Sequence, residues 1–182
     1  MKLQEQSSHM VRVYDNILPS KLCEKLINLF DSSEHQEYIN NNHKPCFTQL
    51  NLNQHHVNVV RNLIPYVEKV YNKYKTKFLP QLSSLEEFRV KRYLTNGNER
   101  FDEHIDVINY STARRVVAFI FYLNDNNGST IFSNQDLNIE PECGRVVVFP
   151  PTWEYPHIGQ ASTKDKYIMS TYLHYGTDNE NV

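Results

Sequence analysis

The sequence predicts a mainly β domain with helices at its N-terminal end, an α+β arrangement. After Pro80 the chain consists of short apolar and β-branched runs separated by turn-forming residues, with no helical pattern between them. Before Pro80, apolar residues recur at helical spacing. The chain has 182 residues, of which 40% are hydrophobic and 22% charged, and this suits one compact domain with a sizeable core.

Composition narrows the classes of function. The 19 Lys and Arg residues against 21 Asp and Glu give a net charge of −2, which argues against a stable nucleic-acid or membrane partner.

Three unpaired cysteines and the lack of a signal-like or membrane-spanning run favour a cytoplasmic protein. Residues 1–9 are set aside as a tail, because Ser7-Ser-His-Met10 resembles a cloning scar, so the single domain is residues 10–182. The abundance of Asn, Lys, Tyr and Ile points to a bacterial or viral source.

The helical part covers about residues 10–80. Ser20 is predicted as the N-cap of a first helix, whose leucines follow at helical spacing. Residues 32–56 are rich in Asn, His and Ser without a clear period, and we expect a long loop there. A second helix is predicted over 57–78 from apolar steps of three and four, with Pro65 kinking or breaking it.

The β block covers about residues 85–175 and favours an antiparallel sandwich or barrel. Its predicted strands are 86–93, 102–108, 114–123, 129–132, 144–149 and 166–174. Residues 116–123 are apolar at every position. This is expected of a strand with one face toward a barrel interior and the other under helices.

One pair in this block suggests metal chemistry. His104 and Asp106 stand at i and i+2 of a predicted strand, so both side chains would project from one face. Alone the pair is weak, because a hydrogen-bonded histidine near a strand end is the simpler interpretation. His157, before the last strand, supplies a third ligand, and two imidazoles with one carboxylate are typical of non-heme Fe(II) oxygenases. Lys166 opens the last strand as a cation that could neutralise a second carboxylate of a bound 2-oxo acid.

Several ordered motifs carry a family resemblance. They are Arg92-Tyr93, Phe101-Asp-Glu-His-Ile-Asp106, Phe121-Tyr-Leu-Asn-Asp125, Gly128-Ser-Thr-Ile-Phe132, Gly144-Arg-Val-Val-Val-Phe149, Pro156-His-Ile-Gly159 and Lys166-Tyr-Ile-Met-Ser-Thr-Tyr-Leu173. In these motifs the chain resembles the prolyl 4-hydroxylase-like branch of the Fe(II)/2-oxoglutarate-dependent dioxygenases, over about residues 86–175. The resemblance implies a double-stranded β-helix (jelly-roll) core with the helices packed on its major sheet.

The resemblance also implies roles for individual residues. The implied catalytic iron ligands are His104, Asp106 and His157. Lys166 is the implied partner of the distal carboxylate of 2-oxoglutarate, with Lys164 as a rival of the same strand parity. Further residues expected around the cosubstrate are Tyr122, Tyr93 and Thr130.

Three weaker candidates for substrate contact complete the site: Trp153, Arg114 and Tyr172. Trp153 packed beneath a loop and Arg114 as an ordinary surface charge are equally acceptable interpretations. Tyr172 shares one strand face with Lys166.

The activity implied by the resemblance is hydroxylation of a C–H bond coupled to conversion of 2-oxoglutarate and O₂ to succinate and CO₂, with Fe(II) and ascorbate as further cofactors. The favoured substrate is a prolyl residue in a protein or peptide, bound by the 32–56 and 95–103 loops. The alternatives are a small molecule such as free proline, a nucleic-acid base, or a non-catalytic metal-binding module.

Overall fold

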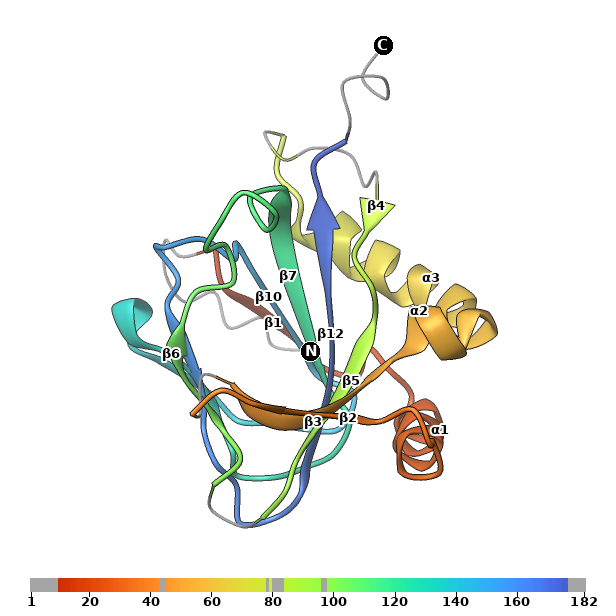
Figure 1. The fold of residues 1–182 in the computed structure, drawn as a ribbon. Coiled ribbons are helices and arrows are strands. Elements are labelled where there is room, and N and C mark those ends of the chain that lie inside the picture. Colours follow the sequence, from red (N-terminus) through yellow and green to blue (C-terminus); the bar gives the residue numbers. More distant parts are fainter. Residues whose placement is uncertain (1–9, 43–44, 78, 80–83, 96–97, 177–182) are drawn as a thin grey trace.

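The computed structural model describes residues 10–42, 45–77, 79, 84–95 and 98–176, so the tail 1–9 and Phe78 of the expected second helix lie outside the described residues. The predicted mainly β architecture is confirmed, because the described strands form two antiparallel sheets that face each other (Figure 1). No described helix combines the length and apolarity that crossing a bilayer requires.

The larger sheet has eight strands among the described residues. Its order is β1 (Arg12–Tyr14), β10 (Val146–Phe149), β7 (Arg115–Tyr122), β12 (Lys166–His174), β5 (Arg89–Tyr93), β3 (Cys46–Asn51) and β2 (Glu37–Asn40), while β4 (Ser84–Leu85) also pairs with β12. The last strand, β12, has the bounds that the sequence predicts. It lies between β7 and β5 at the middle of the sheet.

The smaller sheet has four described strands in the order β6 (Phe101–His104), β11 (His157–Gly159), β8 (Thr130–Phe132) and β9 (Leu137–Ile139). A short 3-10 helix, η1 (Ser133–Gln135), connects β8 to β9. Figure 1 shows β6 facing β5 and β12 across the interior.

Strand β7 separates two apolar cores, as its uniformly apolar sequence predicts. Val117, Phe119 and Phe121 belong to the core shared with the helices. Ala118 and Tyr122 belong to a second core between the two sheets. Because successive side chains of a strand point to opposite faces, an apolar residue at every position places one face in each core.

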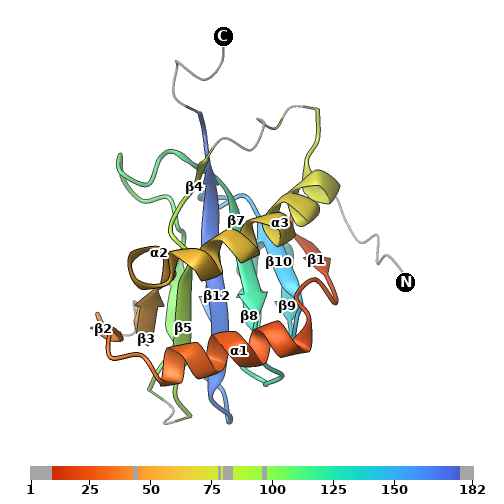
Figure 2. The ribbon, with the colours of Figure 1, turned by 90° about the vertical axis from the view of Figure 1, so that its right-hand side faces the viewer.

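The helices cover the outer face of the larger sheet (Figure 2). They are α1 (Ser20–Asp31), α2 (Leu52–His55) and α3 (Val57–Tyr74). Leu26 and Phe30 of α1, with Leu63 and Val67 of α3, are completely buried in the core that includes β7. Burial of such side chains contributes roughly 1.5–3 kcal/mol each.

Two details of the helices differ from expectation. Ser20 is the first helical residue and Pro19 occupies the N-cap without a side-chain bond, so the predicted cap is one residue off. Of the kink or break predicted at Pro65, the break is wrong, because α3 runs continuously through this residue. Pro65 is solvent-exposed, and the single backbone donor that it removes lies on the side of the helix away from the sheet.

The expected loop over 32–56 is also wrong, and strands interrupt the helical part expected over about residues 10–80. Strands β1, β2 and β3 lie in this part of the chain, and β3 pairs with β5 through Thr48 opposite Arg92 and Leu50 opposite Val90. The residues of β2 and β3 carry little intrinsic strand pattern, so their conformation is set by pairing with the larger sheet, which the local sequence does not encode.

Gly144 joins the N-terminal segment to the larger sheet. Its carbonyl accepts hydrogen bonds from the backbone N–H groups of Ile17 and Leu18, at 2.8 and 3.2 Å. Its φ is +82°, in the left-handed region that favours glycine. A Cβ atom on Gly144 would collide with the carbonyl oxygen of Leu18.

We therefore expect Gly144→Ala to lower the free energy of unfolding by about 2 kcal/mol, measured by urea denaturation, because of left-handed strain and the collision. Gly159→Ala is the matched control, since a Cβ there meets its nearest neighbour, Phe101, at 3.5 Å. It should change the free energy of unfolding by less than about 0.5 kcal/mol. Equal free energies of unfolding in the two variants would contradict the requirement for glycine at position 144.

Candidate active site

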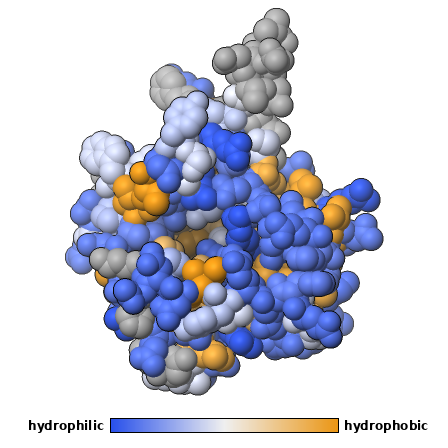
Figure 3. Space-filling model, viewed as in Figure 1, coloured by the Kyte–Doolittle hydropathy of each residue, from blue (hydrophilic) through white to orange (hydrophobic). Residues whose placement is uncertain are grey.

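A pocket opens between the two sheets. In Figure 3, drawn from the same direction as Figure 1, a hollow with apolar side chains inside it interrupts a mostly hydrophilic face. Seven of the residues singled out from the sequence line the pocket: Tyr93, His104, Asp106, Thr130, His157, Lys166 and Tyr172. The structure thus brings together residues from both sheets and from widely separated parts of the chain.

Three potential metal ligands meet in this pocket. His104 ends β6 and His157 begins β11, and the two residues are paired directly in the antiparallel register of the smaller sheet. With Asp106 they offer ligand atoms that all lie within 4.8 Å of one another. Backbone pairing therefore determines the separation of the two imidazoles.

Asp106 is held differently from the sequence expectation. The strand β6 ends at His104, so Asp106 lies in the following loop and does not share a strand face with His104. Arg115 donates a hydrogen bond from Nη1 to the Asp106 carbonyl at 2.8 Å, and Val107 N–H donates to the Pro151 carbonyl at 3.0 Å. These bonds turn the loop so that the carboxylate reaches the histidines.

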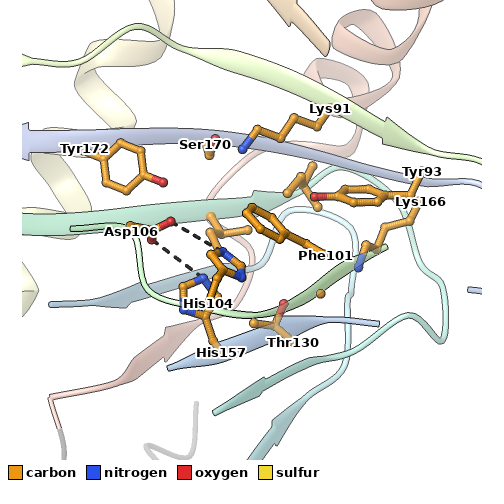
Figure 4. Close-up of a pocket in the computed structure, with 13 residues that line it drawn as sticks. Lys91, Tyr93, Phe101, His104, Asp106, Thr130, His157, Lys166, Ser170 and Tyr172 are labelled. Atoms are coloured by element: carbon orange, nitrogen blue, oxygen red, sulfur yellow. Dashed lines mark ion pairs between the residues drawn. The ribbon is translucent and has the colours of Figure 1, made fainter. Parts of the chain in front are cut away.

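Both imidazoles are oriented by backbone carbonyls. His104 Nδ1 lies 2.9 Å from the Asp102 carbonyl oxygen, and His157 Nδ1 lies 3.1 Å from that of Tyr155. A carbonyl can only accept, so each Nδ1 carries the proton and each Nε2 keeps a free lone pair. The Nε2 atoms lie 3.6 and 3.7 Å from the two oxygens of Asp106 (Figure 4).

Burial and neighbouring charges shift the pKa values of His157 and Asp106. Burial lowers the pKa of His157 to about 4, with Asp106 partly opposing the shift, so this imidazole is neutral at neutral pH. Burial alone would raise the pKa of Asp106, but His157 and then His104 hold it below its ordinary value. The site thus presents a neutral His157 imidazole beside an ionised Asp106 carboxylate.

Aromatic rings surround the two histidines. The ring of Phe101 stacks on His104 with centroids 3.3 Å apart and planes 4° apart. Phe132 and Phe149 lie against His157, at 5.5 and 4.9 Å between centroids. These apolar neighbours limit the access of water to the ligand atoms.

A buried ionic network lies behind the Asp106 loop. The Glu86 carboxylate accepts two hydrogen bonds from Arg115, at 2.6 and 2.7 Å, one from Arg89 at 3.2 Å, and contacts His174 Nε2 at 3.0 Å. The Arg115 guanidinium also covers the ring of Tyr172 at 4.1 Å. Tyr172 in turn lies beside Asp106, whose charge adds to burial in raising the pKa of the Tyr172 hydroxyl.

Lys166 lies at the other end of the pocket and is 2% exposed. Its ammonium donates to the Gly128 and Gln160 carbonyl oxygens, at 2.9 and 3.1 Å, and lies 4.8 Å from the ring centroid of Tyr93. No carboxylate pairs with it within the described parts of the chain. Burial lowers the pKa of Lys166 to about 7. Lys164, its rival in the sequence, is exposed to solvent.

The tyrosines expected near the cosubstrate lie close to Lys166. Tyr93 pairs with Lys166 across β5 and β12 and lines the pocket. Tyr122 is fully buried and donates a hydrogen bond from its hydroxyl to Thr130 Oγ1 at 2.7 Å. Tyr122 thus reaches the pocket through Thr130, which is a lining residue.

Of the three candidates for substrate contact, one lines the pocket and two lie outside it. Tyr172 lines the pocket beside Asp106. Trp153 is 74% exposed and lies on the loop that follows Pro151, while Arg114 is exposed just before β7. Neither Trp153 nor Arg114 lines the pocket.

Sequence reasoning missed Lys91, which lines the pocket. The signal was present, because Lys91 has the same strand parity as Tyr93. It was not decisive, since alternating charged residues in Arg89–Tyr93 equally suit a strand with a solvated face.

Comparisons with known proteins agree with this geometry. Residues 88–174 match the sequence model of the 2OG-Fe(II) oxygenase superfamily, a little under half of the chain. Among curated proteins, no sequence match reaches significance. The resemblance to Fe(II)/2-oxoglutarate-dependent oxygenases is confirmed by this match, and solved prolyl hydroxylases share the fold.

Three such structures are prolyl hydroxylases. One, from Trichoplax adhaerens in complex with a hypoxia inducible factor oxygen degradation domain peptide fragment, has a TM-score of 0.78 at 16% identity, covering 92% of this chain and 84% of that one. The viral collagen prolyl hydroxylase of Paramecium Bursaria Chlorella virus-1, in a 2OG complex, has a TM-score of 0.72 at 17% identity, with 93% and 98% covered. A Pseudomonas putida prolyl-4-hydroxylase has a TM-score of 0.71 at 18% identity, with 93% and 95% covered. At these identities the likeness shows a shared fold.

The Glu86 network should make stability depend on pH. Burial alone would raise the pKa of Glu86, but hydrogen bonds from Arg115 and His174 lower it from 4.5 to about 2. A depressed carboxyl pKa stabilises the fold above pH 4.5, and this contribution disappears as pH falls toward 2. We therefore expect Glu86→Gln to lower the free energy of unfolding by about 2 kcal/mol at pH 7.

Urea denaturation of wild type and variant between pH 7 and pH 2.5 measures this difference, which should shrink below pH 4.5. Glu87→Gln is the control, because its carboxylate is more exposed and pairs only with Arg89 among the described residues. It should cost less than about 0.5 kcal/mol at any pH. A Glu86→Gln difference that stays constant across the range would refute the linkage.

Proposed function

We propose that this protein is an Fe(II)- and 2-oxoglutarate-dependent dioxygenase that hydroxylates a prolyl residue in a protein or peptide, with release of succinate and CO₂. The observation that carries the proposal is the convergence of His104, Asp106 and His157 in a pocket that also holds the buried Lys166. The family match and the shared fold support it. We further propose that the two facing sheets are a double-stranded β-helix (jelly-roll).

The donor set fits a ferrous ion. Two imidazole Nε2 atoms and one carboxylate are the ligands that non-heme Fe(II) oxygenases use, with the other positions left open. The Asp102 and Tyr155 carbonyls fix both imidazoles in the tautomer that a metal needs. We infer that His104, Asp106 and His157 hold the iron, which when bound supplies the activation of O₂ for attack on a C–H bond.

The opposite end of the pocket fits a dicarboxylate cosubstrate. The Lys166 ammonium is buried without a counter-ion among the described residues, and a buried unpaired charge is costly. A carboxylate at Lys166 would supply that counter-ion. Tyr93 and Thr130 would form the wall beside it, with Tyr122 holding the Thr130 hydroxyl. We infer that this end binds 2-oxoglutarate.

The side chains of the pocket position the bound groups and exclude water from the reacting centre. Phe101, Phe132 and Phe149 cover the imidazoles, and the aromatic wall of the pocket keeps the reacting centre apolar. Arg115 holds the backbone of Asp106 through its carbonyl, and Tyr172 lies beside the Asp106 carboxylate. Such preorganisation keeps the cosubstrate and the substrate in reacting geometry. O₂ and ascorbate remain part of the proposal on the strength of the family resemblance alone.

The favoured substrate is a peptide with a prolyl residue. One structural neighbour is a prolyl hydroxylase in complex with a peptide fragment, which supports a peptide substrate here. The loop that follows β6 and the loop that follows Pro151 meet through the Val107–Pro151 hydrogen bond, and they expose Tyr110 and Trp153 to solvent. Exposed aromatic side chains near a pocket are suited to contact an extended peptide.

Turnover tests the proposal. Wild-type protein with Fe(II), 2-oxoglutarate, ascorbate and a pool of proline-containing peptides should release succinate and add one oxygen atom to a prolyl residue, detected by mass spectrometry. His104→Ala should reduce succinate release at least about 100-fold, because one ligand of the metal is lost. Succinate release that is unchanged in His104→Ala would refute the site.

The two lysines allow a matched comparison. Lys166→Met should weaken 2-oxoglutarate binding roughly 10- to 100-fold, since a charge-assisted hydrogen bond in a buried site is lost. Lys164→Met should leave the affinity within about twofold, because this side chain is exposed. Anaerobic titration of the Fe(II) protein with 2-oxoglutarate, followed by visible charge-transfer absorption, measures both. If only Lys164→Met bound 2-oxoglutarate more weakly, Lys164 and not Lys166 would be the partner of its carboxylate.

A further inference from the structure

The proposed function leaves one cation of the pocket without a role. Lys91 of β5 lies opposite Ile168 of β12, two residues along from the pair formed by Tyr93 and Lys166. Residues i and i+2 of a strand share a face, so Lys91 projects into the same pocket as Lys166. Figure 4 shows Lys91 above the histidines and Lys166 to their right, both projecting from strands of the larger sheet.

The Lys91 ammonium has no charged partner of its own. Within the described residues, no hydrogen bond or ion pair reaches it, and its nearest recorded contact is the Phe47 ring at 4.9 Å from Nζ to the centroid. Asp106 is the acidic group that most favours its charge, while Arg89 and Arg115 oppose it. Glu86, the other acidic neighbour, is already bonded to both arginines. Burial lowers the pKa of Lys91 to about 8.

The charge balance of the loaded pocket leaves room for one more anion. A divalent metal ion, Asp106, Lys91 and Lys166 together carry three positive charges. A 2-oxoglutarate dianion supplies two negative charges, so one positive charge remains in the pocket. Metal binding also takes up the charge of Asp106, the acidic neighbour that stabilises Lys91. A single carboxylate restores neutrality, whereas a phosphate dianion would exceed it.

We propose that Lys91 binds a carboxylate of the substrate, within the same pocket as the reacting carbon. Ser170, its diagonal neighbour on β12, also lines the pocket and offers a hydroxyl donor to the same carboxylate. The inference rests on the proposed function. It narrows the substrate class to molecules that carry a carboxylate close to the carbon that is hydroxylated. That group is the α-carboxylate of a free amino acid or the side chain of an acidic residue beside a peptidyl proline.

Matched acid and amide probes separate these sources. The first pair is L-proline and L-prolinamide, and the second is acetyl-Ala-Pro-Glu-Ala-amide and acetyl-Ala-Pro-Gln-Ala-amide. Binding is measured by calorimetry with full-length protein loaded with Fe(II) and 2-oxoglutarate under nitrogen, so that no turnover is needed. The proteins are wild type, Lys91→Met and, as a control, Lys164→Met, whose lysine is exposed.

In wild type and in Lys164→Met, the acidic member of one pair should bind about 10- to 100-fold more tightly than its amide. The pair that shows this difference identifies the source of the carboxylate. Lys91→Met should lose the difference while its affinity for 2-oxoglutarate stays within about twofold of wild type, which shows that the variant is folded and loaded.

Three results would overturn the inference. They are equal binding of acid and amide in wild type, an equal loss for both in Lys91→Met, and loss of 2-oxoglutarate binding in Lys91→Met. The last would make Lys91 a cosubstrate residue. Wild-type protein that binds no 2-oxoglutarate at all would instead refute the proposed function, and the inference with it.

Discussion

The site depends on one backbone register, the antiparallel pairing of β6 with β11 that sets His157 opposite His104. This pairing brings together two imidazoles from distant parts of the chain, and the carbonyls that orient them come from the same two segments. Asp106 completes the group only because Arg115 and Tyr172 reach its loop from the larger sheet. The proposed metal site therefore draws on residues of both sheets, and it requires both sheets to be correctly packed.

Much of this arrangement is readable from the sequence, for identifiable reasons. The bounds of β12 and the two-sided burial of β7 follow from apolar content, which records burial directly. The ligand set follows from residue type and chain order. Strands β2 and β3 do not follow, because their conformation comes from pairing with β5 and leaves no periodic signal. The place of Asp106 beyond β6 depends on a hydrogen bond from Arg115, a residue that local pattern cannot connect to it.

The charged groups in the pocket and the charged groups behind it are balanced differently. Glu86 with its arginines forms a closed, neutralised network behind Asp106, while Lys91 and Lys166 project inward without counter-ions among the described residues. Fixed cations in a low-dielectric cavity attract anions more strongly than the same groups in water. The net charge of the whole chain, −2, thus gives no indication that the pocket attracts anions, because the charge inside the pocket is positive.

The central strand β12 has a further consequence for how this protein can change. Its odd-numbered residues, such as Met169 and Leu173, anchor the core beneath the helices, whereas Lys166, Ile168 and Ser170 face the pocket. Stability and chemical selectivity are thus assigned to opposite faces of one strand. Replacement of an inward side chain can redirect selectivity while the outward anchors stay untouched, so a scaffold of this kind can diversify its chemistry one position at a time without losing its fold.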